Sequence, residues 1–169
     1  MNPVQERVRD LANKSLPHKY VADHGRVVEA NLQRVQIAGQ QVTISEDITQ
    51  DELSLIEEAV QVTQPGAKEC FSNALELWQY DQRFEYAEGY ASGPLDPEFI
   101  VEHAWSMLDG EKIVDPTAEF EHYYGVGISS EQILEQNTGA NFSPEGIICR
   151  RENRDFLRKQ GYTKHEITK

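Results

Sequence analysis

Long apolar runs and basic residues are both scarce in this chain. No apolar stretch approaches the roughly 18–20 residues of a membrane-spanning helix, so no membrane span is expected. The 16 Lys and Arg residues are outnumbered by 29 Asp and Glu, giving a net charge of −13. Such a charge repels phosphate backbones and anionic headgroups. Neither nucleic acid nor a membrane surface is therefore expected as a partner.

Cysteine is also rare, since Cys70 and Cys149 are the only two. Two cysteines are too few for a disulfide scaffold, and reduced thiols are expected. The N-terminal segment is charged where a secretory signal carries its apolar stretch, which predicts a cytoplasmic protein. The length of 169 residues and the 38% apolar share suit one domain with its own core.

Hydrophobic periodicity predicts the α+β class, with a helix that bears Cys70 packed on an antiparallel β-sheet and additional N-terminal helices. Helices are expected over 3–14, after the cap residue Thr49, and over 67–80, and short helices over 130–136 and 153–159. Strands are expected over 84–91, 99–108 and 111–114, whereas 24–44 fits either helix or strand. The single domain, 1–169, then has a core over about 64–128 and an N-terminal helical flank over 1–63.

Cys70 is the first candidate for chemistry. It lies near the start of its predicted helix, where unpaired backbone N–H groups and the helix dipole favour the thiolate, the form that attacks. The alternative is an inert buried cysteine. Cys149 has no comparable setting, and no role is assigned to it.

His103 and Asp115 complete a possible catalytic group. His103 falls in the middle of an otherwise apolar strand face, where an imidazole needs a hydrogen-bond partner. It is either a satisfied core histidine or a general base directed at Cys70. Asp115, fixed by Pro116, could orient the imidazole and stabilise its charged form.

The hairpin between the two strands decides whether this pairing is possible. A two-residue loop, 109–110, would place Asp115 opposite Ala104 and on the wrong side of the sheet. A three-residue loop, 108–110, with a bulge at Gly110 would instead pair His103 with Asp115. The same register pairs Trp105 with Ile113 and Met107 with Glu111, so apolar packing also favours it. We therefore predict the three-residue loop, 108–110.

Four segments together resemble the transglutaminase-like superfamily of papain-type cysteine enzymes. They are Cys70–Ala74, Tyr86–Tyr90, His103–Trp105 and Val114–Thr117. In that superfamily a cysteine on a helix is followed by a Gly-Tyr strand, a His-Ala-Trp strand and an Asp-Pro turn, in this order. The resemblance implies a Cys-His-Asp triad and acyl transfer on amides. It also suggests Gln64, six residues before Cys70, as an oxyanion donor, with a solvated loop glutamine as the alternative.

The expected function is thiol-dependent acyl transfer on amide bonds, as in a peptidase, amidase or deamidase, with a peptide or protein amide as substrate. The alternative is a non-catalytic module that uses the same cleft to hold a peptide. No cofactor is expected, and a metal site with His122, His103, Asp115 and Cys70 is the weaker possibility, because their spacing matches no zinc signature. The fold alone does not fix the substrate, and the oligomeric state stays open.

Three further expectations concern polar and aromatic residues outside this group. Residues 123–127 are expected to cover the sheet, with the rim of a substrate cleft as the alternative. Glu88 and Glu102 are expected on solvated strand faces. The histidines at 18, 24 and 165 lack a matching partner in the sequence and are expected at the surface.

Overall fold

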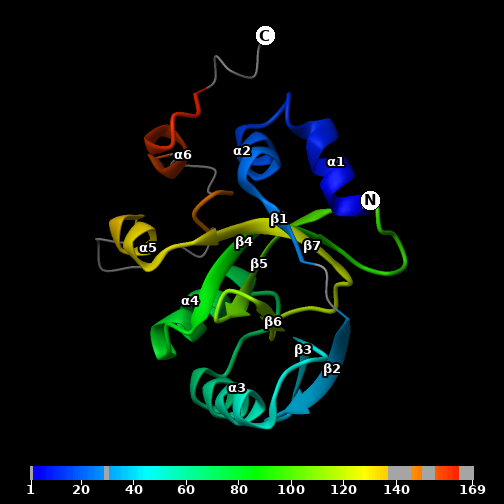
Figure 1. Cartoon of the computed structure of the whole chain (residues 1–169), viewed down its shortest axis with the longest axis vertical. Coiled ribbons are helices and arrows are strands. Elements are labelled where there is room, and N and C mark those ends of the chain that lie inside the picture. The colour runs from blue at the N-terminus through cyan, green and yellow to red at the C-terminus, as the bar shows by residue number, and fades with distance from the viewer. Residues whose placement is uncertain (1, 29–30, 137–145, 150–154, 164–169) are drawn as a thin grey trace.

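The computed structural model describes residues 2–28, 31–136, 146–149 and 155–163. Figure 1 shows a central sheet with helices α1, α2 and α6 toward one end and helix α3 toward the other. The described helices are α1 (Pro3–Leu11), α2 (Leu16–His24), α3 (Gln50–Thr63), α4 (Cys70–Tyr80), α5 (Ser130–Gln136) and α6 (Asp155–Lys159). The described strands are β1 (Arg26–Val27), β2 (Leu32–Ile37), β3 (Gln40–Ser45), β4 (Phe84–Ser92), β5 (Val101–Leu108), β6 (Lys112–Asp115) and β7 (His122–Ile128).

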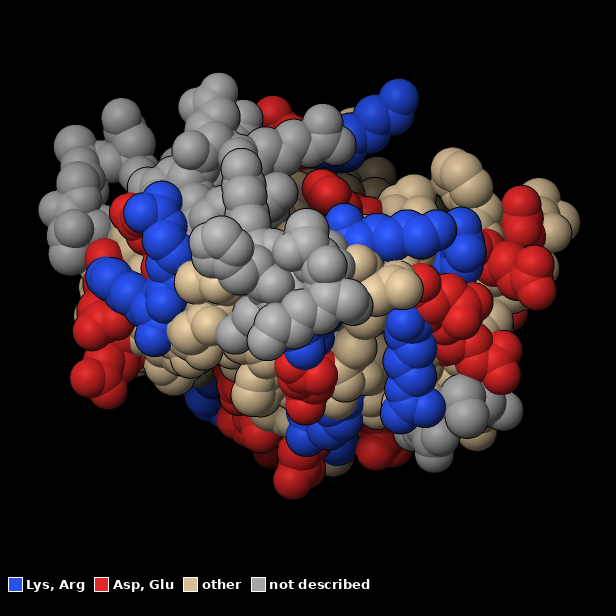
Figure 2. All heavy atoms as spheres, turned by 90° about the horizontal axis from the view of Figure 1, so that it is seen from above, with Lys and Arg blue, Asp and Glu red and all other residues tan. Residues whose placement is uncertain are grey.

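The strands described form one seven-stranded sheet in the order β1-β7-β4-β5-β6-β3-β2, and each neighbouring pair is antiparallel. The predicted α+β class is therefore confirmed. Among the described residues no helix combines the length and the apolar character that crossing a bilayer demands. On the face seen in Figure 2, acidic and basic side chains are interspersed rather than gathered by sign.

Local sequence explains the best-predicted element, helix α3. The Thr49 hydroxyl accepts a bond from the Glu52 N–H at 3.2 Å, and the Glu52 carboxylate accepts one from the Thr49 N–H at 2.8 Å. This reciprocal capping box fixes where the helix begins. By contrast, the flank over 1–63 is not helical throughout, because 24–44 contributes strands β1 and β2 and most of β3.

The two faces of the sheet hold different clusters of buried side chains. On one face Leu75 and Trp78 of α4 pack with Tyr86 of β4 and Ala104 of β5. On the other face lie Ala87, Ala91, Trp105, Met107, Ile113 and Tyr123. Because neighbouring residues of a strand point to opposite faces, His103 shares the second face with Trp105.

The β5–β6 hairpin differs from the predicted one. Leu108 pairs with Lys112 and Met107 with Ile113. The predicted cross-strand pairs are therefore wrong, namely Met107 with Glu111, Trp105 with Ile113 and His103 with Asp115. The loop is 109–111, because both Asp109 and Gly110 adopt left-handed backbone, with φ of 53° and 73°. This register lies two residues from the prediction, and it leaves Asp115 on the same face as His103.

Candidate active site

Cys70 is the first residue of helix α4 and is partly exposed. The preceding residue, Glu69, makes no side-chain capping bond to the helix. The first backbone N–H groups of a helix have no intrahelical acceptor, so the N–H of Cys70 is available to a ligand. The start of α4 thus combines a thiol with an uncapped, positively polarised helix end.

Asn73 ties the segment before Cys70 to the segment after Asp115. Its side-chain amide donates to the Gly66 carbonyl at 2.8 Å and to the Thr117 hydroxyl at 2.9 Å. Its amide oxygen accepts from the Gly66 N–H at 3.0 Å. The Asn73 side chain is buried, so these bonds are shielded from water. One residue of α4 therefore holds the two segments in a fixed relation.

His103 and Asp115 form a buried hydrogen-bonded pair. The Nε2 atom of His103 lies 2.7 Å from Oδ2 of Asp115, with side-chain exposures of 3% and 0%. The other carboxylate oxygen of Asp115, Oδ1, accepts a bond from the Thr117 N–H at 3.0 Å. The carboxylate is thus fixed from two directions, and it orients the imidazole.

The charge state of His103 follows from these contacts. Burial by itself lowers the pKa of His103, but the Asp115 carboxylate and a side-chain hydrogen bond with Cys70 outweigh burial and raise it to about 9. Because Asp115 occupies Nε2, the ring nitrogen left for the Cys70 thiol is Nδ1. The carboxylate and the thiol both act on the charge of this imidazole, and we call Cys70, His103 and Asp115 the row.

Helix α4 and the His103 side chain lie on opposite faces of the sheet, so Cys70 can approach His103 only around an edge of the sheet. The apolar residues of α4 pack on the face opposite to His103. The β5–β6 ladder covers only residues 106–108 and 112–114, so within the described chain β5 has no strand beyond it on this side near His103. A thiol at the start of α4 can reach the imidazole past this open edge.

Gln64 is not part of the row formed by Cys70, His103 and Asp115. It ends helix α3 with left-handed backbone at φ 48°, and its N–H donates to the Val60 carbonyl at 2.9 Å. Its side chain is exposed, which fits a solvated loop residue. Its role as an oxyanion donor remains a prediction.

Two site residues escaped the sequence reasoning. Tyr123 donates its hydroxyl to Oδ2 of Asp115 at 2.7 Å, although 123–127 was expected only to cover the sheet or to rim a cleft. Asn73 was noted for the resemblance and not for a positioning role. The one indication of the position of Tyr123 in the sequence is the small residue at position 91, which lies opposite Tyr123 on the neighbouring strand and leaves room for its ring.

Glu88 was expected on a solvated strand face, and this prediction is wrong. Its carboxylate is fully buried and accepts bonds from the Tyr86 hydroxyl and the backbone N–H groups of Ile147 and Cys149 at 2.5, 2.6 and 2.7 Å. Glu102 is exposed, as expected. The Cys149 thiol is buried, and its pKa is raised by burial and by the Glu88 carboxylate. The two cysteines therefore differ sharply in environment.

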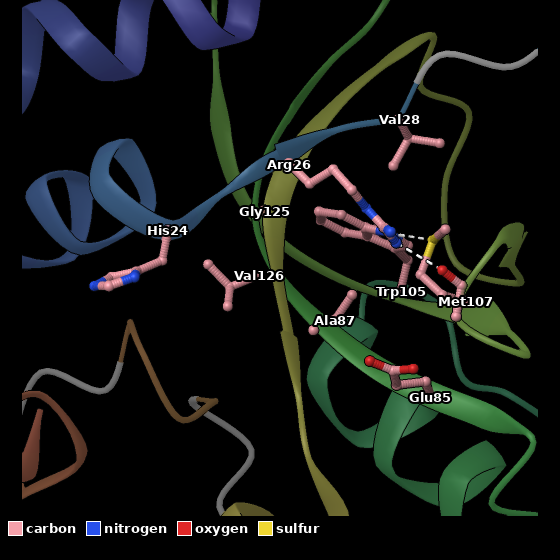
Figure 3. A pocket seen from close by; sticks show the side chains of 11 residues that line it. His24, Arg26, Val28, Glu85, Ala87, Trp105, Met107, Gly125 and Val126 are labelled. Atoms are coloured by element: carbon pink, nitrogen blue, oxygen red, sulfur yellow. Dashed lines mark hydrogen bonds between the residues drawn. The ribbon is translucent and has the colours of Figure 1, made fainter.

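A pocket of about 340 Å³ opens on the same face of the sheet as His103 (Figure 3). Arg26, Glu85, Trp105 and Met107 are among its lining residues, whereas the row of Cys70, His103 and Asp115 is not. The ring of Trp105 links the two places, because it stacks on His103 with centroids 5.9 Å apart. The pocket is therefore adjacent to the row and separate from it.

The row has the parts required for nucleophilic chemistry: a thiol, a base beside it and a carboxylate that orients the base. Of the other histidines, His122 begins β7, His24 is exposed as expected, and position 165 lies outside the described residues. His18 was expected at the surface, but it is half-buried and its ring stacks on Tyr90. Within the described residues no group of His, Cys, Asp or Glu side chains is arranged to hold a metal ion.

No family model, curated protein or solved structure matches this chain.

Proposed function

We propose that this protein carries out thiol-dependent acyl transfer on amide bonds, with Cys70 as nucleophile, His103 as base and acid, and Asp115 as the residue that orients His103. The observation that carries the proposal is the buried His103–Asp115 bond of 2.7 Å, and the influence of Cys70 on the pKa of His103 supports it. In this proposal helix α4, packed against β4 and β5, presents the thiol to the imidazole.

The first half of the reaction forms a thioester. Nδ1 of His103 holds the proton of the Cys70 thiol as an imidazolium, and the thiolate sulfur attacks the amide carbon to form a C–S bond. The carbonyl oxygen becomes an oxyanion, which accepts a bond from the Cys70 N–H at the helix start. When the intermediate collapses, the C–N bond breaks and the imidazolium gives its proton to the leaving amine.

The second half releases the acyl group. Nδ1 of His103 takes a proton from water or a second amine, whose oxygen or nitrogen attacks the thioester carbon. The C–S bond then breaks, the acid or new amide leaves, and the proton stays on His103, which restores the resting pair of thiolate and imidazolium. Throughout, the Asp115 carboxylate stabilises the imidazolium without itself being protonated.

The test uses p-nitrophenyl acetate, which acylates reactive thiols, followed by acid quenching and peptide mass spectrometry. The acetyl group is expected on the peptide that contains Cys70, at a rate at least tenfold above that of free cysteine at the same pH. Release of ammonia or amine from a library of peptide amides then reports amide turnover.

The two cysteines provide matched controls. Cys149→Ala should retain labelling, because the Cys149 thiol is buried, whereas Cys70→Ala should lose both labelling and turnover. Acetylation of Cys149, or reaction of Cys70 no faster than free cysteine, would overturn the proposal. Saturable binding of the peptide amides without turnover would favour the peptide-binding module instead.

A further inference from the structure

Tyr123 makes a contact that the proposed reaction does not by itself require. Its hydroxyl donates to Oδ2 of Asp115 at 2.7 Å, the same oxygen that His103 bonds at 2.7 Å. The Tyr123 side chain is fully buried, so no water replaces this bond. Two donors therefore share one carboxylate oxygen.

The sheet brings Tyr123 to Asp115 across two intervening strands. Tyr123 lies on β7, and β4 and β5 separate it from β6 in the sheet order. Its partner on β4 is Ala91, and His103 on β5 is opposite Gly89. A side chain at Gly89 would collide with the β7 backbone, since its Cβ would lie 2.4 Å from the Tyr124 carbonyl oxygen. These small residues let β7 lie close to β4 and leave room on this face of the sheet for the Tyr123 ring.

We infer that Tyr123 is a positioning residue that shares the Asp115 carboxylate oxygen with His103 and thereby limits how firmly that carboxylate holds and charges the imidazole. A hydrogen bond to a carboxylate stabilises the negative charge and leaves less of it for a second partner. Tyr123 would thus set the pH range over which His103 exchanges its proton. This inference rests on the proposed function, because the imidazole in question is its base.

Among the described residues, two further titratable groups act on His103 or Tyr123. Cys70 of α4 faces His103, and Arg34 of β2 acts on Tyr123 while it is paired to Glu119 at 3.1 Å. The pKa of Tyr123 is raised well above its usual range by burial and by the Asp115 carboxylate, so its hydroxyl stays protonated. It therefore acts as a permanent donor to Asp115.

The experiment follows the His103 ring by NMR in a Cys70→Ala background, where no thiol titrates beside it. Tyr123→Phe keeps the ring and removes the hydroxyl. The released carboxylate then attracts the imidazolium more strongly, so the pKa of His103 should rise by about 0.5–1 pH unit. An unchanged or lowered value would overturn the inference.

Tyr124→Phe is the matched control, because it removes a neighbouring hydroxyl that donates to the Ala22 carbonyl at 3.2 Å and not to Asp115. It should leave the His103 titration where it was. Should Tyr123→Phe fail to fold, site-specific 3-fluorotyrosine at position 123 keeps the bond, strengthens the donor and should lower the pKa of His103. The titration needs no reactive thiol, so it can succeed or fail independently of the labelling of Cys70.

Discussion

Two histidines on opposite faces of the sheet, the buried His103 and the half-buried His18, have opposite properties. His103 bonds the Asp115 carboxylate, and its pKa is raised to about 9. His18 of α2 stacks on the Tyr90 ring with centroids 4.3 Å apart, and its pKa is lowered to about 4 by burial and by the charge of Arg7. Among the described residues, Nδ1 of His18 is buried without a hydrogen-bond partner.

The difference between the two shows that burial alone does not decide what a histidine does. Burial disfavours the imidazolium at both positions, and at His103 the Asp115 carboxylate, together with Cys70, reverses the effect. His18 therefore stays neutral at ordinary pH and serves packing, whereas His103 carries a proton that it can give and take. The same comparison predicts how each histidine responds when its surroundings are changed.

The largest expected effect comes from Asp115→Asn, which leaves the His103 imidazole, like that of His18, without a carboxylate partner. Without the carboxylate, burial dominates, so the pKa of His103 should fall below its ordinary value. Acetylation of Cys70 should slow by a factor on the order of 10²–10⁴. NMR titration and the p-nitrophenyl acetate assay measure the two effects. A loss of less than about tenfold in rate would mean that Asp115 does not support the base.

The alkaline side of the stability profile should depend on His103. Because its folded pKa is raised, its contribution is fully present below about pH 6.5 and is lost as the pH rises through about 9. The free energy of unfolding should fall over this range by an amount on the order of 3 kcal/mol. Urea denaturation of the protein and of His103→Gln measures it. In the variant the free energy of unfolding should fall less steeply with rising pH. An equal pH dependence in the two proteins would contradict the raised pKa of His103.

The acid side should depend on His18, with the opposite sign. Its folded pKa is lowered, so the unfolded chain binds the extra proton first, and stability is lost as the pH falls from about 6.5 to about 4. His18→Phe keeps a ring on Tyr90 and should remove about 1–2 kcal/mol of that loss, a figure reduced for partial exposure. Urea denaturation at pH 7 and pH 4.5 tests this. An identical loss in both proteins would show that His18 is already solvated.

Much of the site follows from local patterns in the sequence. The break before residue 67 and the apolar spacing after it predict a helix with Cys70 in its first turn, and Cys70 is its first residue. Strand alternation together with the predicted three-residue loop places His103 and Asp115 on one face. This holds although the register was wrong, because a shift of two residues preserves the side on which each residue lies.

The misses concern information that no local pattern contains. An Asp-Gly pair fits several hairpin loops, so it does not tell whether the loop is 108–110 or 109–111. The contact of Tyr123 with Asp115 depends on the order of strands in the sheet, and that order is set by the whole fold. Glu88 reads as a surface residue because the segment at 147–149 that satisfies its carboxylate is distant in sequence.

The most direct test of the central claim is whether the imidazole controls the reactivity of the sulfur. In a Cys149→Ala background, the rate at which iodoacetamide alkylates Cys70 at pH 6.5 is compared between a protein that keeps His103 and one that carries His103→Gln. If Cys70, His103 and Asp115 act as one row, the rate in the His103→Gln protein should be at least about tenfold lower. Equal rates in the two proteins would show that the imidazole does not affect the reactivity of the Cys70 sulfur.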